Sequence, residues 1–273
     1  MNCSLRLLPR FLMLMVMVVP CAAQAEDSAK AIVQRSIEKR QVRNSIQTLT
    51  MTIEDLAKDG TVRGTRTRTI ETKVRDDDDA VRSHIRFVAP ADMAGIQFVS
   101  ITPDSGSTEQ FMYYPPPDEM LNRISGSGRS GSFFGSNFSF EDMEISSADD
   151  AEHKLLGEET LTIGGASIAC WKIESTPHED AKSTYGKIIS WIAKDNDMPR
   201  QVLFFDRKMR ELKKMTILEV KKDGSIWLPI RTQMEGIQRP GRTQLVIDSY
   251  RTNVPTSEIP SEIFTEAGVR SAG

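Results

Sequence analysis

The sequence predicts a mainly β protein whose antiparallel strands follow one another as a meander that curls into a sandwich or a barrel. Apolar and polar residues alternate with a period of two in most segments after residue 47. Turn signals such as Asp59-Gly60, Gly164-Gly165 and Asp223-Gly224 separate these segments at short and regular intervals. The alternation of strands and helices that marks a parallel sheet is absent from the sequence. These observations together indicate an all-antiparallel sheet.

The first 25 residues have the pattern of a cleaved signal peptide. Arg6 and Arg10 supply positive charge, residues 11–19 are an unbroken apolar run, and Ala23-Gln24-Ala25 matches a cleavage site. The apolar run is shorter than the roughly 20 residues that a permanent membrane anchor needs. We therefore expect export to the periplasm and a mature chain of residues 26–273. Cys21 suggests a lipid-modified N-terminus as an alternative, which Pro20 disfavours because that processing needs a small residue before the cysteine.

Size, charge and cysteine content limit the classes of protein that remain. The 273-residue chain has a formal net charge of −3, which becomes −5 once Arg6 and Arg10 leave with the signal. A mildly acidic chain has no overall attraction for nucleic acid. Cys170 is the one cysteine outside residues 1–25, so we expect no intramolecular disulfide. We interpret it as a small buried apolar residue rather than a reactive thiol.

Residues 27–45 are expected to form the main helix. Asp27 or Ser28 can cap its start, and an apolar stripe with helical spacing includes Ile32, Val33 and Ile37. Basic and acidic residues fill the other side. Such an amphipathic helix is expected to lie against an apolar surface.

A hairpin follows, with strands at residues 48–56 and 61–74 on either side of Asp59-Gly60. Its return strand has one face that is only partly apolar, so we expect this strand to line a cavity or to lie at an edge. Asp76 to Asp79 form an acidic turn, which we interpret as a solvated tip rather than a calcium site because alternating ligand positions and a glycine bend are missing.

The remaining strands are expected at residues 82–88, 97–102, 110–114, 155–163, 166–175, 187–193, 199–206, 209–220, 226–235 and 244–250. The last segment, residues 255–273, is expected to be a tail with at most a short helical turn near residues 260–264.

Residues 113–143 are the least generic part of the chain. A Pro115-Pro116-Pro117 run and a Gly/Ser stretch lead to four phenylalanines, at positions 133, 134, 138 and 140. We expect these rings to dock, either as ordinary core or as a flap over an apolar ligand. The glycines at 126, 128 and 131 match a dinucleotide fingerprint, but no helix pattern follows them, so we expect no nucleotide binding.

Chemistry-bearing motifs are sparse. His84, His153 and His178 are far apart, and none has a second histidine or a cysteine at metal-ligand spacing. No nucleophile elbow, Walker loop or zinc-protease motif occurs in the sequence. We therefore expect neither a metal, a cofactor nor an enzymatic activity.

Four segments make the chain similar to the LolA-like family of outer membrane lipoprotein-sorting proteins. They are FVAPADMAGIQFVSI (87–101), MYYPPPDEMLNRIS (112–125), SGSFFGSNFSFEDM (130–143) and WIAKDNDMPRQVLFFD (191–206). The resemblance implies that residues 26–273 form a single strongly curved antiparallel sheet, an unclosed β-barrel or half-barrel. It also implies that the N-terminal helix and short helical segments plug the concave side.

The resemblance further implies a periplasmic carrier that binds lipoprotein acyl chains or another lipophilic molecule in an apolar cavity. It implies an RND-type inner-membrane exporter as a partner. On this hypothesis the wall or flap residues are Phe98, Phe111, Tyr113, Phe133, Phe134, Trp171 and Trp191, and the lid residues are Ile32, Val33 and Ile37. The alternative is a non-carrier periplasmic subunit with a filled cavity, which docks an envelope transporter through an edge of its sheet.

Overall fold

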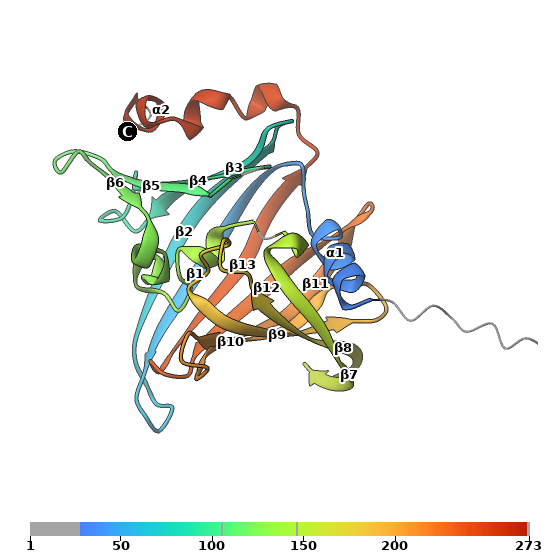
Figure 1. The fold of residues 1–273 in the computed structure, drawn as a ribbon. Coiled ribbons are helices and arrows are strands. Elements are labelled where there is room, and N and C mark those ends of the chain that lie inside the picture. The colour runs from blue at the N-terminus through green and yellow to red at the C-terminus, as the bar shows by residue number, and fades with distance from the viewer. Residues whose placement is uncertain (1–27, 105, 146, 272–273) are drawn as a thin grey trace, which may run out of the picture.

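The computed structural model describes residues 28–104, 106–145 and 147–271, and the expected signal peptide lies outside these residues. The described chain forms one sheet of 13 antiparallel strands that curves strongly without closing into a barrel (Figure 1). The half-barrel that the family resemblance implied is therefore confirmed.

The elements follow the chain in a simple order. The first strands are β1 (Asn44–Leu56), β2 (Val62–Asp76), β3 (Ala80–Ala89), β4 (Gln97–Pro103), β5 (Glu109–Tyr114) and β6 (Met120–Ile124). The later strands are β7 (Ala151–Ile163), β8 (Ala166–Pro177), β9 (Tyr185–Ala193), β10 (Pro199–Asp206), β11 (Glu211–Asp223), β12 (Ile226–Gly236) and β13 (Gly241–Thr252). The helical elements are α1 (Ala29–Glu38), η1 (Gly126–Ser130), η2 (Phe133–Gly135), η3 (Glu141–Met143), η4 (Ala148–Asp150), η5 (Thr256–Glu258), η6 (Ser261–Phe264) and α2 (Glu266–Ser271).

The order of strands across the sheet determines where the connections lie. It runs β6-β5-β4-β3-β2-β1-β13-β12-β11-β10-β9-β8-β7, so β1 and β13 meet in the middle and β6 and β7 are the two edges. The chain must therefore cross the whole sheet between β6 and β7. Residues 125–150, hereafter the crossing segment, make this connection on the inside of the curve (Figure 1).

Strand registers separate the two faces of the sheet. Phe98 pairs with Ile85 and Met112, and these side chains pack with the crossing segment on what we call the inner face. Val99 pairs with Phe111 and lies on the outer face, because successive strand residues point to opposite sides. There, η5, η6 and α2 cover strands β3 to β5 and bury Phe264 and Val269 (Figure 1).

Three local expectations from the sequence were wrong. The helix ends at Glu38 rather than near residue 45, because Asn44 already begins a strand that pairs with β2 and continues against β13. Strand β6 was not expected; it pairs with β5, and its Leu121 and Ile124 pack against the hydrophobic clusters. The tail at residues 255–271 forms three helical elements, η5, η6 and α2, rather than one short turn, and it packs against the sheet with Ile259 and Phe264 fully buried.

Other expectations are clarified by the topology. Strand β2 lies between β1 and β3, so it is not an edge, and its Arg68 and Ile70 are buried on the inner face. The acidic turn is neutralised in part by arginines, because Asp77 accepts from both Arg75 and Arg82.

Candidate functional site

The crossing segment fills one half of the inner face with aromatic rings. Phe133, Phe138 and Phe140 are buried, and Phe134 is half-buried. The ring centroid of Phe133 lies 5.3 Å from that of Phe98, and Phe134 lies 4.5 Å from Phe87. Such separations are typical of packed aromatic pairs. The rings therefore pack in the core of the inner face, and their role as a flap over an apolar ligand stays a prediction.

Polar contacts hold the crossing segment in place. Lys213 of β11 forms an ion pair with Asp142, and both side chains are only 7% exposed. The Tyr185 hydroxyl donates to Asp142 at 2.6 Å, and the Ser139 amide donates to the same carboxylate at 2.7 Å. Burial, reinforced by the charge of Asp142, raises the pKa of Tyr185 well above its usual value. Buried charges are tolerated only when they are paired and hydrogen-bonded, which this cluster achieves.

Further hydrogen bonds fasten the segment to the middle of the sheet and to its other half. The Gln110 side-chain amide donates to the Phe140 carbonyl at 2.9 Å, and the Asn137 amide donates to the Thr243 hydroxyl at 2.9 Å. The Arg68 guanidinium donates to the Phe134 carbonyl. The segment is therefore bonded to strands β2, β5, β9, β11 and β13.

Helix α1 covers the other end of the inner face. Its first turn is capped by the Ser28 hydroxyl, which accepts from the Ala31 amide at 3.2 Å. Ile32 is fully buried against Ile173 and Ile192, and Val33 packs beside them. Ile173 pairs with Ser190, and Ser190 pairs with Val202, so these three side chains lie on the same face of the sheet. Val202 belongs to the inner-face core, so Ile173 also faces inward.

Between these two covers lies a strip of half-buried apolar side chains, hereafter the inner strip. It consists of Leu49, Ile188, Met215 and Leu245, on strands β1, β9, β11 and β13. All four pack against the buried core but retain exposed surface. Half-exposed apolar side chains in a concave face are the feature expected of a site for a lipophilic ligand.

Methionines are prominent in the inner-face cluster. Six of them belong to it: Met51, Met93, Met112, Met143, Met215 and Met234. Unbranched thioether side chains fill irregular gaps and adapt their shape readily. They occur both in the aromatic half, where Met112 pairs with Phe98, and in the inner strip, which includes Met215.

The structure does not bring the seven expected wall residues together. Phe98, Phe133 and Phe134 lie in the inner-face core, and Trp171 lies on the same face beneath α1. Phe111 and Tyr113 lie on the outer face under the C-terminal tail, and Trp191 lies on the outer face beside Cys170. Of the expected lid residues, Ile32 and Val33 pack onto the sheet, and Ile37 is half-buried.

The sequence contained the signal that separates these residues. Phe111 and Met112 are neighbours, so strand alternation sends them to opposite faces, and the same holds for Trp191 and Ile192. Aromatic content alone did not reveal which face was the inner one. The inner strip was missed because its members are ordinary apolar residues.

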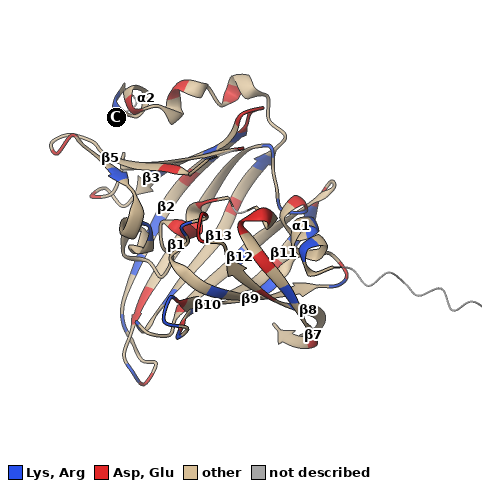
Figure 2. Cartoon of the chain, viewed as in Figure 1, with Lys and Arg blue, Asp and Glu red and all other residues tan. Residues whose placement is uncertain are grey.

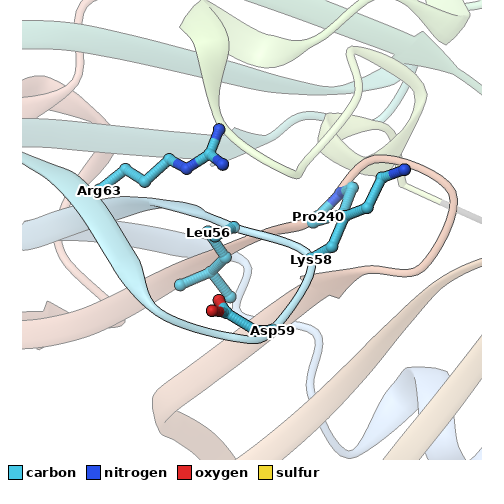
Figure 3. Close-up of a pocket in the computed structure, with 6 residues that line it drawn as sticks. Leu56, Lys58, Asp59, Arg63 and Pro240 are labelled. Atoms are coloured by element: carbon cyan, nitrogen blue, oxygen red, sulfur yellow. The ribbon is translucent and has the colours of Figure 1, made fainter.

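Sites for other chemistry are not evident. Within the described residues, no group of three or more His, Cys, Asp or Glu side chains is placed to hold a metal ion. Cys170 is fully buried, and burial raises the pKa of its thiol to about 11. Two surface depressions, of about 460 and 440 Å³, lie at opposite ends of the strands and not over the inner strip. The first is formed by the β1–β2 hairpin and Pro240 (Figure 3).

Comparison with known proteins places this fold in the LolA-like class. An outer membrane lipoprotein-sorting protein domain from Vibrio parahaemolyticus is 24% identical, with a TM-score of 0.78 over 89% of this chain and 98% of its own. A DUF1329 family protein from Desulfovibrio piger is 23% identical, with a TM-score of 0.74 over 88% and 100%. A LolA superfamily protein from Nitrosomonas europaea is 18% identical, with a TM-score of 0.65 over 88% and 98%.

A family model described as "Uncharacterized protein" matches residues 79–271, and the chain belongs to that family. Its fold is that of the LolA-like lipoprotein-sorting proteins, as the sequence segments indicated. No curated protein sequence matches the chain. In the described part of the chain, none of the helices has the length and apolar character needed to cross a membrane.

Proposed function

We propose that this protein is a periplasmic carrier that binds an acyl chain of a lipoprotein, or another lipophilic molecule, along the inner strip. The observation that supports it is the row of half-buried Leu49, Leu245, Met215 and Ile188 between two covering elements. Shielding an acyl chain from water is worth about 25 cal/mol per Å² of apolar surface. A curved sheet with half-buried apolar side chains on its concave face can provide that shield.

Deep insertion of a ligand requires one cover to move. The rings of Phe133 and Phe140 occupy the inner face over β3 to β5, so a long chain extends along the strip only if the crossing segment or α1 shifts. Of the two covers, we expect helix α1 to move more readily. It buries Ala29 and Ile32 against the sheet, and two ion pairs hold its ends, the exposed Lys30–Asp149 pair and the Arg35–Asp197 pair.

Substitution within the strip tests the proposal. The Leu49→Asn/Leu245→Asn variant is expected to bind the fluorescent fatty acid cis-parinaric acid at least about tenfold more weakly, because a buried amide loses its water without gaining a partner. The Leu203→Asn variant is the matched control, since Leu203 is a half-buried leucine on the outer face. Circular dichroism checks that both variants fold. Equal probe affinity in the wild type and the strip variant would refute the proposal.

A second function deserves a test because the aromatic half of the inner face is packed. On this alternative the protein is a non-carrier subunit that docks an envelope transporter, and the packed Phe133 core is its permanent filling. Native mass spectrometry of gently purified protein distinguishes the two. Co-purified lipid supports the carrier, and repeated lipid-free preparations support the docking subunit.

The exporter partner is a separate proposal. An RND-type inner-membrane exporter follows from the family resemblance in the sequence, and cross-linking in intact cells followed by mass spectrometry tests it. Recovery of a different class of membrane protein would reject it.

A further inference from the structure

One rim of the sheet carries an unusual set of turns. The β1–β2 hairpin, the β12–β13 turn and the β10–β11 turn lie side by side there, because β1 pairs with β13 and β12 pairs with β11. We call residues 57–63, 206–211 and 237–240 the basic rim. Gln238 bridges two of its turns by donating to the Asp206 carboxylate at 3.0 Å and to the Glu211 carbonyl at 2.9 Å. Pro240 and the hairpin enclose the depression of Figure 3.

Exposed apolar side chains occur at this end of the strands. In the part of the chain that the structure describes, six large apolar side chains are exposed: Val62, Val88, Met120, Leu156, Met209 and Ile237. Val88 and Met120 lie near the β3–β4 and β5–β6 turns, away from the basic rim. Three belong to the basic rim, where Val62 is 45%, Met209 56% and Ile237 44% exposed.

The basic rim is also rich in cations. Its six basic side chains are Lys58, Arg63, Arg207, Lys208, Arg210 and Arg239, against three acids, Asp59, Asp206 and Glu211. Within the described residues, Lys58, Arg63, Lys208 and Arg239 form no salt bridge, and all four are exposed. Arg207 is held by the Ser183 carbonyl, and Arg210 pairs with Asp206 at 2.7 Å.

Three turns at the opposite end of the strands have the reverse charge. These turns, at residues 76–80, 194–198 and 222–226, contain seven acids and two lysines. In Figure 2, the turn between β2 and β3 is red at one end of the sheet, and blue segments gather at the other end, near β10 and the β1–β2 hairpin. These three turns therefore differ in charge from the three turns of the basic rim.

We infer that the basic rim docks on a bilayer surface that carries anionic phospholipid headgroups. Isolated apolar side chains at turn tips, with long cations between them, suit the headgroup region, where the tips enter the interface and the cations meet phosphates. A protein partner would instead be matched by a contiguous apolar patch with a polar border. The inference does not depend on the inner strip being a ligand site.

Vesicle co-sedimentation of the mature chain tests this inference. The protein is expected to bind vesicles of phosphatidylglycerol and phosphatidylcholine at low salt but not vesicles of phosphatidylcholine alone. Added salt is expected to weaken the binding, since it screens exposed charges beyond about 10 Å at 0.1 M. No binding to the anionic vesicles at low salt would overturn the inference.

Matched variants assign the surface. The Lys58→Glu/Lys208→Glu variant is expected to bind the anionic vesicles about tenfold or more weakly. The Met209→Ser/Ile237→Ser variant is expected to lose the part of the binding that added salt does not remove. The controls are Lys154→Glu/Lys222→Glu, which makes the same charge change away from the rim, and Leu156→Ser. Equal losses in the controls would overturn the assignment. Fatty acid binding in solution is expected to stay unchanged in the rim variants, which separates this outcome from failure of the carrier proposal.

Discussion

The ammonium group of Lys213 and the carboxylate of Asp142 form an ion pair between β11 and the crossing segment, and both side chains are almost completely buried. Lys213 also donates to the Ser139 hydroxyl at 3.2 Å, and Ser139 lies 2.9 Å from the Tyr185 hydroxyl. A charge pair of this kind joins residues 71 positions apart. It makes the position of the crossing segment dependent on the far half of the sheet.

Removing one partner of this pair is expected to be costly. Lys213→Met leaves the Asp142 carboxylate buried without a counter-charge, and the free energy of unfolding is expected to fall by about 3–5 kcal/mol. The double variant Asp142→Asn/Lys213→Met is expected to lose less than the sum of the single changes. Urea unfolding measures all three. Lys214→Met is the control, because its partly exposed pair with Glu235 is worth at most about 1 kcal/mol.

The phenylalanines of the crossing segment are expected to contribute unequally. Phe133 is fully buried among Phe98, Phe134 and Phe140, so Phe133→Ala should cost about 3–5 kcal/mol of unfolding free energy. Phe134 is half-buried, so Phe134→Ala should cost less. Denaturant unfolding of the two variants under identical conditions decides the order. A larger loss for Phe134→Ala would contradict the packing described here.

The C-terminal tail is expected to release from the outer face as the pH falls. His84 lies under Phe264 and hydrogen-bonds Gln97 at 2.8 Å, which in turn donates to the Val269 carbonyl at 2.8 Å. Burial lowers the pKa of His84 below its ordinary 6.5. The hydrogen bond with Gln97 and the charge of Glu71 raise this pKa in part, and the positive charges of Lys73 and Arg86 lower it further. The unfolded chain therefore binds the proton more readily than the folded one, so the stability contribution of neutral His84 is complete above pH 6.5 and falls below it.

Comparison with His84→Gln isolates this effect. Between pH 7 and pH 5 the wild-type protein is expected to lose more stability than the variant, as measured by thermal unfolding, and tail residues are expected to exchange amide hydrogens faster. Parallel pH profiles for the two proteins would show that His84 does not control the tail.

Cys170 is expected to be inert in the folded protein. Its side chain is fully buried in β8, and the pKa of about 11 leaves almost no thiolate at pH 8. A chain that starts at Glu26 contains no other cysteine. Ellman's reagent should therefore react slowly with native protein and completely in urea. Fast reaction without denaturant would contradict the burial of this residue.

Much of the fold followed from local sequence pattern. The strand at residues 199–206 has the predicted bounds, and the hairpin at Asp59-Gly60 forms as its turn chemistry requires. Alternation with a period of two persists in a strand whatever lies around it, so it can be identified from the sequence. The candidate site was less accessible, because Leu49 and Leu245 lie 196 positions apart and come together only when β1 pairs with β13.

The amino-acid sequence by itself determined every strand except β6, the antiparallel class, the docking of the phenylalanine-rich segment and the likeness to LolA-like proteins. Tertiary structure alone decided which face of each strand is the inner one, that Phe111 and Trp191 point outward, and that the tail covers the outer face. The physical reason is that period-two alternation separates the two faces of a strand but does not show which one becomes the inner face. That is decided by α1, the crossing segment and the tail, which bury one face or the other once the sheet has curved.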